Sequence, residues 1–429
     1  MLGRLGSKRG WKSMNHHKIT TGQERCLRGQ IIDDRQPGPI LRDFRVLLDF
    51  LGSEGITVGG KYNLIPMKFL GDLNERLSRP LHLDMKRPQL RSHPYLQGLN
   101  LLLRASGLSR IEGAGTKTRL VLVREMMAQW DRLNLTERYF QLLEAWLRVG
   151  RAEMVGERRQ IWSSLLLSCL QTWESIPEKG LRFNLEKPRE LYLPGLGRDF
   201  YQLALMDLFG LCEVEQPAGP VTTWSPAGVM AVPFGDAVFT LIASSHLAWD
   251  LREEPADEDE EEETPVLPRF GAWQAAFRPY FPEWLENLEF PEPEQREGDF
   301  VFRVSVGKVW RLIAIPADAT LDDLVGWILQ SVEFDDDHLY EFRYRNRLGA
   351  EATAGHPGTD EGPWVDEIRI GTLPLEPGQS MQLRYDFGDD WRFDVRLERI
   401  DPPGGKAEGA RILGRHGESP EQYPNHWDE

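Results

Sequence analysis

Carboxylates and one histidine gather in two short stretches near the C-terminal end of the sequence. The six candidates are Asp335, Asp337, His338, Asp386, Asp389 and Asp390. Oxygen donors of this kind, with an imidazole beside them, suit magnesium, manganese or calcium. If the six side chains converge on one divalent cation, the site could cleave phosphodiester bonds with a metal-activated water.

The same residues also fit a structural interpretation. Gly388 between aspartates is typical of a tight turn, because glycine adopts positive φ and aspartate accepts hydrogen bonds from nearby amides. Strand alternation places Tyr385 and Phe387 on one face, and Trp391 follows the turn, so that aromatic side chains would lock a hairpin. His338 lies between a predicted helix and a predicted strand, where capping aspartates can orient a structural histidine. The sequence leaves both interpretations open.

The surrounding pattern predicts the elements that must position these residues. Residues 300–315 alternate like a strand, and a helix with an apolar face at Leu321, Leu324 and Ile328 follows, capped by Asp318 or Thr320. Further strands are expected at 340–344 and 368–370, then a hairpin over 381–400. This order indicates an α+β domain with one helix on a mainly antiparallel sheet.

This region resembles the plasmid ORF-3-like family (pRi-plasmid ORF-3-like), also described as a resolvase-like passenger protein of insertion elements. The matching positions are Pro316, Thr320, Leu321, Leu324, Phe334, Asp335, His338, Leu339, Phe342 and the signature Tyr385-Asp386-Phe387-Gly388-Asp389-Asp390-Trp391. The resemblance covers about residues 298–403 and implies a domain without an assigned catalytic role. The glycine-rich residues 349–364 and the tail after the hairpin depart from the family pattern. Some relatives carry added DNA-binding domains.

The N-terminal half reads as mainly helical, with winged-helix-like units. Helical patterns over residues 40–51, from Pro66, and from Pro94 precede a hairpin near residues 109–123, which is the element order of a winged helix. A second, less regular unit has helices over 137–149, 160–173 and 199–209. The third helix of the first unit would present Gln97, Asn100 and Arg104 to base edges. The basic residues expected to contact phosphates are Lys86, Arg87, Arg91, Arg110, Lys117 and Arg119. A solvated helix face with a basic loop is the alternative interpretation.

Charge and composition set the domain boundaries. The net charge of −16 divides unevenly, with 33 basic against 26 acidic residues in 1–250 and 18 against 41 in 251–429. Nine carboxylates between Glu253 and Glu263 predict a solvated acidic linker. We therefore expect a flexible basic arm (1–35), a winged-helix-like unit (36–130), a helical unit for which a second winged-helix-like fold is an option (131–250), the linker (251–268), the α+β domain (269–403) and a tail (404–429). Aromatic residues of 270–288 are expected to pack on the α+β domain.

Three scattered cysteines, no apolar leader and no long apolar run favour a cytoplasmic protein without a membrane span. The domain organisation favours a non-enzymatic protein over an enzyme. We expect an adaptor or regulator whose N-terminal half binds DNA, RNA or a partner protein, and whose C-terminal domain binds a protein or ligand. The alternatives are a metal-dependent phosphodiester-cleaving enzyme and a purely structural protein-interaction module. No cofactor is indicated beyond the candidate divalent cation.

Overall fold

The computed structural model describes residues 18–113, 115–157, 164–183, 193–196, 200–219, 224–244, 269–359, 362–403 and 409–423. The expected acidic linker, residues 1–17 of the expected basic arm and the last residues of the tail lie outside the described residues. The chain divides into two compact units. The N-terminal unit holds most of the described residues up to Phe290, and the C-terminal unit holds those from Pro291 on.

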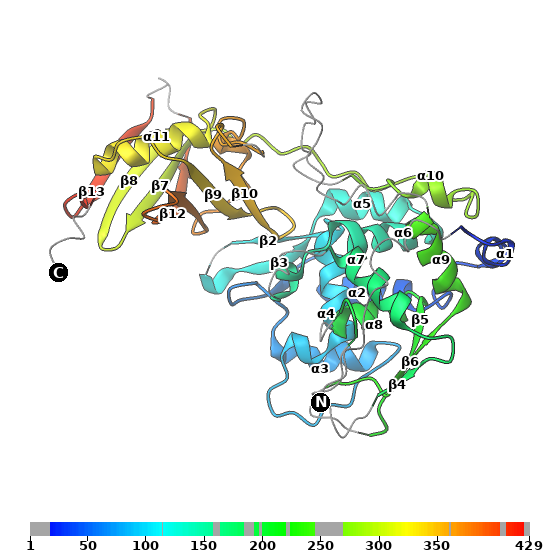
Figure 1. Ribbon diagram of the computed structural model, residues 1–429. Coiled ribbons are helices and arrows are strands. Elements are labelled where there is room, and N and C mark those ends of the chain that lie inside the picture. The colour runs from blue at the N-terminus through cyan, green and yellow to red at the C-terminus, as the bar shows by residue number, and fades with distance from the viewer. Residues whose placement is uncertain are drawn as a thin grey trace, which may run out of the picture. The chain divides into compact units, whose positions relative to one another are not determined.

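The N-terminal unit is mainly helical (Figure 1). The expected helices of its first part form α2 (Ile40–Leu51), α3 (Met67–Arg76) and α4 (Pro94–Ala105). The expected hairpin forms β2 (Ser109–Glu112) and β3 (Arg119–Leu122), and β1 (Ile56–Thr57) extends it in the order β1-β3-β2. An additional helix, α1 (Thr21–Gly29), lies within the expected flexible arm, closed at its start by a capping box from Thr20 and Gln23.

The second part of this unit follows the predicted order with shifted boundaries. Helix α5 (Arg124–Arg132) leads to α6 (Leu135–Glu144), which continues as a π-helical turn over Ala145–Val149. Then come α7 (Leu165–Ser175), α8 (Phe200–Leu208), β5 (Cys212–Glu215), β6 (Gly228–Ala231) and α9 (Pro233–Ser244). The short strand β4 (Leu181–Arg182) completes a sheet in the order β4-β6-β5.

The aromatic segment after the acidic block packs on the N-terminal unit, which corrects the expectation that it covers the α+β domain. Residues 269–290 include the short helix α10 (Gln274–Phe277). The Trp284 ring stacks on Phe140 of α6, with ring centroids 4.4 Å apart. Side chains of α6 also accept backbone N–H groups of the segment: Glu144 accepts from Gly271 and Trp273 at 2.6 and 2.7 Å. We call residues 269–290 the strap.

The C-terminal unit is a seven-stranded antiparallel sheet crossed by one helix (Figure 1). Its strands are β7 (Asp299–Val306), β8 (Val309–Pro316), β9 (Tyr340–Arg345), β10 (Glu351–Gly355), β11 (Ser380–Tyr385), β12 (Trp391–Asp401) and β13 (Arg411–His416). Their spatial order is β10-β9-β11-β12-β7-β8-β13. Helix α11 (Leu321–Val332) starts at a capping box formed by Thr320 and Asp323.

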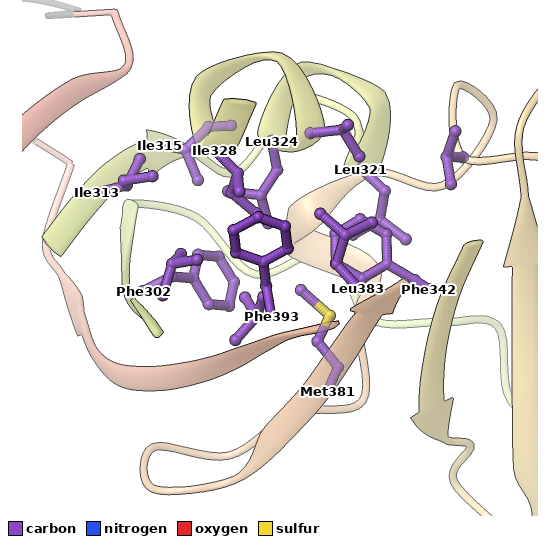
Figure 2. Packing of buried hydrophobic residues seen from close by; sticks show 14 of the residues in the cluster. Phe302, Ile313, Ile315, Leu321, Leu324, Ile328, Phe342, Met381, Leu383 and Phe393 are labelled. Carbon is purple, nitrogen blue, oxygen red and sulfur yellow. The ribbon is translucent and has the colours of Figure 1, made fainter. Parts of the chain in front are cut away.

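One face of this sheet builds the core with α11. Figure 2 shows Leu321, Leu324 and Ile328 of the helix pointing at apolar side chains of the strands. Phe302 and Phe393 come from neighbouring strands and are fully buried. Because side chains alternate along a strand, the residues between these apolar ones project from the opposite face of the sheet. We call that opposite face, away from α11, the open face.

Three predicted elements of this unit differ from the structure. The single strand expected over 300–315 is a hairpin, β7 and β8, that turns at Gly307 and Lys308. The strand expected at 368–370 is replaced by a 3₁₀ turn over Ile370–Thr372. The glycine-rich insertion and the tail, which depart from the family pattern and for which no strand was predicted, supply the two edge strands β10 and β13.

Candidate functional site

The turn between β11 and β12 is closed by Asp386. Its backbone has φ +54°, and its Oδ1 accepts the Gly388 N–H at 2.8 Å. The Asp390 N–H donates to the Asp386 carbonyl at 2.7 Å, which closes the loop. Asp386 is buried and Phe387 is exposed, because the positive φ at Asp386 ends the strand alternation. The expected shared face of Tyr385 and Phe387 is therefore wrong. The predicted turn forms, and Asp386 accepts a nearby amide as expected, but the positive φ expected at Gly388 lies at Asp386 and Asp390 instead.

His338 lies beside this turn in a small polar cluster. Its Nε2 is 3.4 Å from Oδ1 of Asp337 and 3.6 Å from Oδ2 of Asp386. The Tyr423 hydroxyl is 3.3 Å from the same nitrogen and donates to Asp337 at 3.3 Å. One imidazole nitrogen of His338 thus faces two carboxylates and a phenol.

The aromatic residues of the signature hold this end of the sheet together. The buried Tyr385 hydroxyl donates to the Asp335 carbonyl, and burial raises the pKa of Tyr385 to about 12. Trp391 packs edge-on against Phe334, with centroids 4.8 Å apart, and its indole N–H donates to the Gln422 carbonyl. The buried Gln422 side chain in turn accepts the Asp335 N–H at 2.7 Å. The described end of the tail, at Gln422, therefore packs on the folded domain.

The six proposed metal ligands do not converge. Asp390 lies between two arginines, 2.5 Å from Arg384 and 2.8 Å from Arg392, and their hydrogen bonds lower its pKa. Asp335 and Asp389 form hydrogen bonds here through their backbone N–H groups and not through their carboxylates. The Asp335 N–H donates to the Gln422 side chain, and the Asp389 N–H donates to Asp386 Oδ1. Within the described residues, no group of three or more His, Cys, Asp or Glu side chains is placed to hold a metal ion. Convergence of all six side chains on one cation is thus not seen: Asp337 and Asp386 lie near His338, whereas Asp390 is ion-paired with Arg384 and Arg392.

The open face carries a second and larger group of polar side chains. Register places Arg343 of β9, Gln382 of β11, Asp394 of β12 and Ser305 of β7 in one row across the sheet. Neighbouring rows hold further arginines: Arg384 opposite Arg392, and Arg396 opposite Arg303. The arginines of this face include Arg303, Arg343, Arg345, Arg384, Arg392 and Arg396, and towards one end of the sheet Arg399 and Arg411, which are ion-paired with Asp401 and Asp299.

The predicted base-reading residues are inside the N-terminal unit. Gln97, Asn100 and Arg104 of α4 are 3%, 0% and 3% exposed. The helix is buried on every side, and at Gly98 an added Cβ would lie 2.7 Å from the Leu205 side chain of α8. Gln97 donates to Glu157, and Arg104 donates to the carbonyls of residues 62 and 63. The expectation that this helix presents the three side chains to DNA is therefore wrong, because all three are buried inside the unit. Gln97 and Arg104 have hydrogen-bond partners there, whereas the buried Asn100 amide has none among the described residues.

The expected phosphate-contacting residues differ in their exposure. Lys86, Arg87 and Arg91, in the segment before α4, are exposed. Arg110 and Lys117, in the β2–β3 hairpin, are also exposed, whereas Arg119 is half-buried. Basic side chains thus lie on the surface in the segment before α4 and at Arg110 and Lys117 of the hairpin, apart from the buried helix.

The open-face arginines escaped the sequence prediction. The alternation in β12 of Arg392, Asp394 and Arg396 with buried Phe393, Val395 and Leu397 was a visible signal. It showed one charged face of a strand, but not that arginines of β7, β9 and β11 would line up beside it. That alignment depends on the register between strands far apart in the sequence.

Across the described residues, no helix combines the length and apolar character needed to cross a membrane.

The C-terminal unit resembles known proteins. The uncharacterized protein y4hQ of Sinorhizobium fredii is 30% identical over 117 residues, which are 26% of this chain and 57% of that protein. A crystal structure of a protein of unknown function from Methanosarcina mazei, MM3350, aligns with 24% identity over 29% of this chain and 72% of that one, at a TM-score of 0.27. Residues 302–423 match the family model of the plasmid pRiA4b ORF-3-like proteins, and the C-terminal domain is of this family.

Proposed function

We propose that this protein is a non-enzymatic adaptor or regulator whose C-terminal domain binds a partner protein through the open face. One observation carries the proposal. The side chains of the signature residues Tyr385, Asp386 and Trp391 form hydrogen bonds with backbone groups of the same domain. The charged side chains of the open face, by contrast, project into solvent. The signature thus maintains the fold, and the open face remains for recognition.

The two groups of residues differ in what they offer a ligand. Around His338 the carboxylates and the Tyr423 hydroxyl already contact the imidazole. On the open face, Arg303, Arg343 and Arg396 are exposed on three different strands. Arginine is enriched at protein interfaces because its planar head forms several directed hydrogen bonds. A broad, rigid sheet surface with such heads suits a macromolecular partner better than a small substrate.

Site-specific photocrosslinking tests this proposal. A photoreactive amino acid replaces Asp394 on the open face in one variant and the exposed Gln330 on α11 in the matched control. Both are expressed in the native host and irradiated. We expect a discrete crosslinked protein from position 394 and none from position 330. Equal crosslinking from both positions, or none from position 394, would contradict the proposal.

A second candidate function is nucleic-acid binding by the N-terminal unit, favoured by the exposed Lys86, Arg87 and Arg91. Such binding would rest on phosphate contacts, and its affinity would fall steeply with salt. Labelled duplex DNA and RNA titrated with the full chain over a salt series would measure it. Replacing the three residues with alanine should weaken binding and reduce the salt slope. No binding at low salt would reject this candidate and leave the adaptor proposal unaffected.

A further inference from the structure

Register brings five residues of the open face into one row across five adjacent strands. Arg396 of β12 lies opposite Ser380 of β11 on one side and Arg303 of β7 on the other. Arg303 lies opposite Leu312 of β8, and Leu312 lies opposite Gly414 of β13. We call these five residues the arginine row. Resting on the proposed function, we propose that the arginine row binds an acidic peptide segment of the partner that also carries an apolar side chain.

The same sheet shows what the arginine row lacks. Arg384 and Arg392 also face each other across two strands, and Asp390 bridges them, with one carboxylate oxygen on each guanidinium at 2.5 and 2.8 Å. Arg303 and Arg396 form an equivalent cross-strand pair. Like charges directly opposite each other destabilise a sheet. At the first pair, the Asp390 carboxylate lies between Arg384 and Arg392 and offsets the repulsion between them.

No described carboxylate forms an ion pair with Arg303 or Arg396. Asp394 lies on the same face, but its register partner is Ser305, and it is ion-paired with neither arginine. Both arginines are exposed. An incoming carboxylate would remove the repulsion between the two guanidinium groups and accept hydrogen bonds from both, as Asp390 does at the first pair.

The apolar end of the row identifies the second part of the ligand. Leu312 is half-buried, and Gly414 beside it has no side chain to cover it. Trp310, one row away on the same face, has the Arg303 guanidinium 4.5 Å from its ring centroid. A leucine or phenylalanine next to an acidic residue would cover Leu312 while its neighbour's carboxylate meets Arg303.

The chemistry of this face favours a peptide over a nucleic acid. Single-stranded nucleic acids bind through bases stacked on free aromatic faces. Here the Trp310 ring has Arg303 over it and stacks with His416, and Phe387 has the Arg384 guanidinium 4.8 Å from its centroid. Residues 291–429 also hold 15 basic against 29 acidic residues, which repels a long phosphate backbone. A short acidic peptide carries less charge and gains from apolar contact.

The test measures binding of a fluorescently labelled synthetic peptide, made of glutamates and aspartates around one leucine, to the full chain over a salt series. A peptide with glutamine and asparagine in place of the acids, and labelled oligothymidylate, are the comparison probes. The double variant Arg303→Gln with Arg396→Gln is compared with Arg369→Gln with Arg415→Gln. The control removes the same charge from exposed arginines outside the row. Thermal unfolding verifies that each variant is folded.

We expect saturable binding of the acidic peptide that weakens about tenfold or more in the Arg303/Arg396 variant and stays unchanged in the control variant. The neutral peptide should not bind. No saturable binding, equal loss in both variants, or a preference for oligothymidylate would overturn the inference. A crosslink from position 394 that persists while the acidic peptide fails to bind would reject this inference alone, whereas loss of both would reject the proposed function as well.

Discussion

Asp386 combines two demands that few residues meet together. It adopts φ +54°, and its Oδ1 accepts the N–H of Gly388. Asparagine tolerates the left-handed region and keeps the acceptor, whereas alanine loses the acceptor and disfavours the backbone angle.

We therefore expect Asp386→Ala to lower the free energy of unfolding of the C-terminal unit by about 1–2 kcal/mol. Asp386→Asn should retain most of it. Denaturant unfolding followed by circular dichroism measures the difference. If both variants lose equal stability, the negative charge matters rather than the turn geometry.

The two cross-strand arginine pairs predict opposite effects of charge removal. Arg396→Gln should leave stability unchanged or raise it by about 0.5 kcal/mol, because it removes repulsion from Arg303. Asp390→Asn should lower the melting temperature, since Arg384 and Arg392 would lose their shared carboxylate.

The hydrogen bonds from Arg392 and Arg384 lower the pKa of Asp390. Its contribution to stability is therefore present above the unfolded pKa and is lost as pH falls through the folded pKa. Melting temperatures of both variants and the wild-type chain at neutral and acidic pH test the pair. A loss of stability in Arg396→Gln would mean that this arginine supports the fold.

At the scale of elements, the strap depends on α6 through apolar and polar contacts. Trp284 is fully buried against Phe140, whereas the next residue, Leu285, is 61% exposed. Trp284→Ala should destabilise the N-terminal unit by about 3–5 kcal/mol, and Leu285→Ala should have little effect. Differential scanning calorimetry would assign the shifted transition. A shift in the transition of the C-terminal unit instead would return the strap to that unit.

Glu144 makes the strap contact sensitive to pH. Burial raises its pKa to about 6, although Arg148 and the N–H groups of Trp273 and Gly271 oppose the shift. A raised folded pKa means that the stability from this group is present in full below the unfolded pKa and is lost as pH rises through about 6.

From pH 7 toward pH 4.5, Glu144 should thus add up to about 2 kcal/mol to the free energy of unfolding, as a shift from 4.5 to about 6 implies. Glu144→Gln should remove this increment. Denaturant unfolding of the wild-type chain and the variant at both pH values gives the difference. An identical pH dependence in the two chains would show that Glu144 does not titrate in this range.

Local sequence patterns predicted the ranges of helices and strands better than they predicted which side chains those elements contact in the fold. Helix α2 matches its predicted range because its apolar residues recur at helical spacing, and α11 begins at the predicted Thr320 cap. The polar face of α4 was read as exposed, but its Gln97 finds Glu157 inside the unit. The strap carries no local sign that it packs on Phe140, because the two are far apart in the sequence.

On the scale of the whole molecule, the family match at residues 302–423 agrees with the predicted C-terminal domain and extends it into the tail. The short edge strands β10 and β13 lie in glycine-rich stretches, so composition concealed them. Gln422 beside Trp391 shows why the tail is needed for the signature. The open face was not predictable, because it exists only once seven strands are in register.

The central claim is that the signature maintains the fold and the open face recognises a partner. The most direct test measures melting temperature and the position-394 crosslink together in two sets of variants. Tyr385→Phe, Asp386→Ala and Trp391→Ala should lower the melting temperature and lose the crosslink only in proportion to unfolding. Arg303→Gln, Arg343→Gln and Arg396→Gln should keep the melting temperature and lose the crosslink. A signature variant that stays fully folded yet loses the crosslink, beside open-face variants that keep it, would contradict the account.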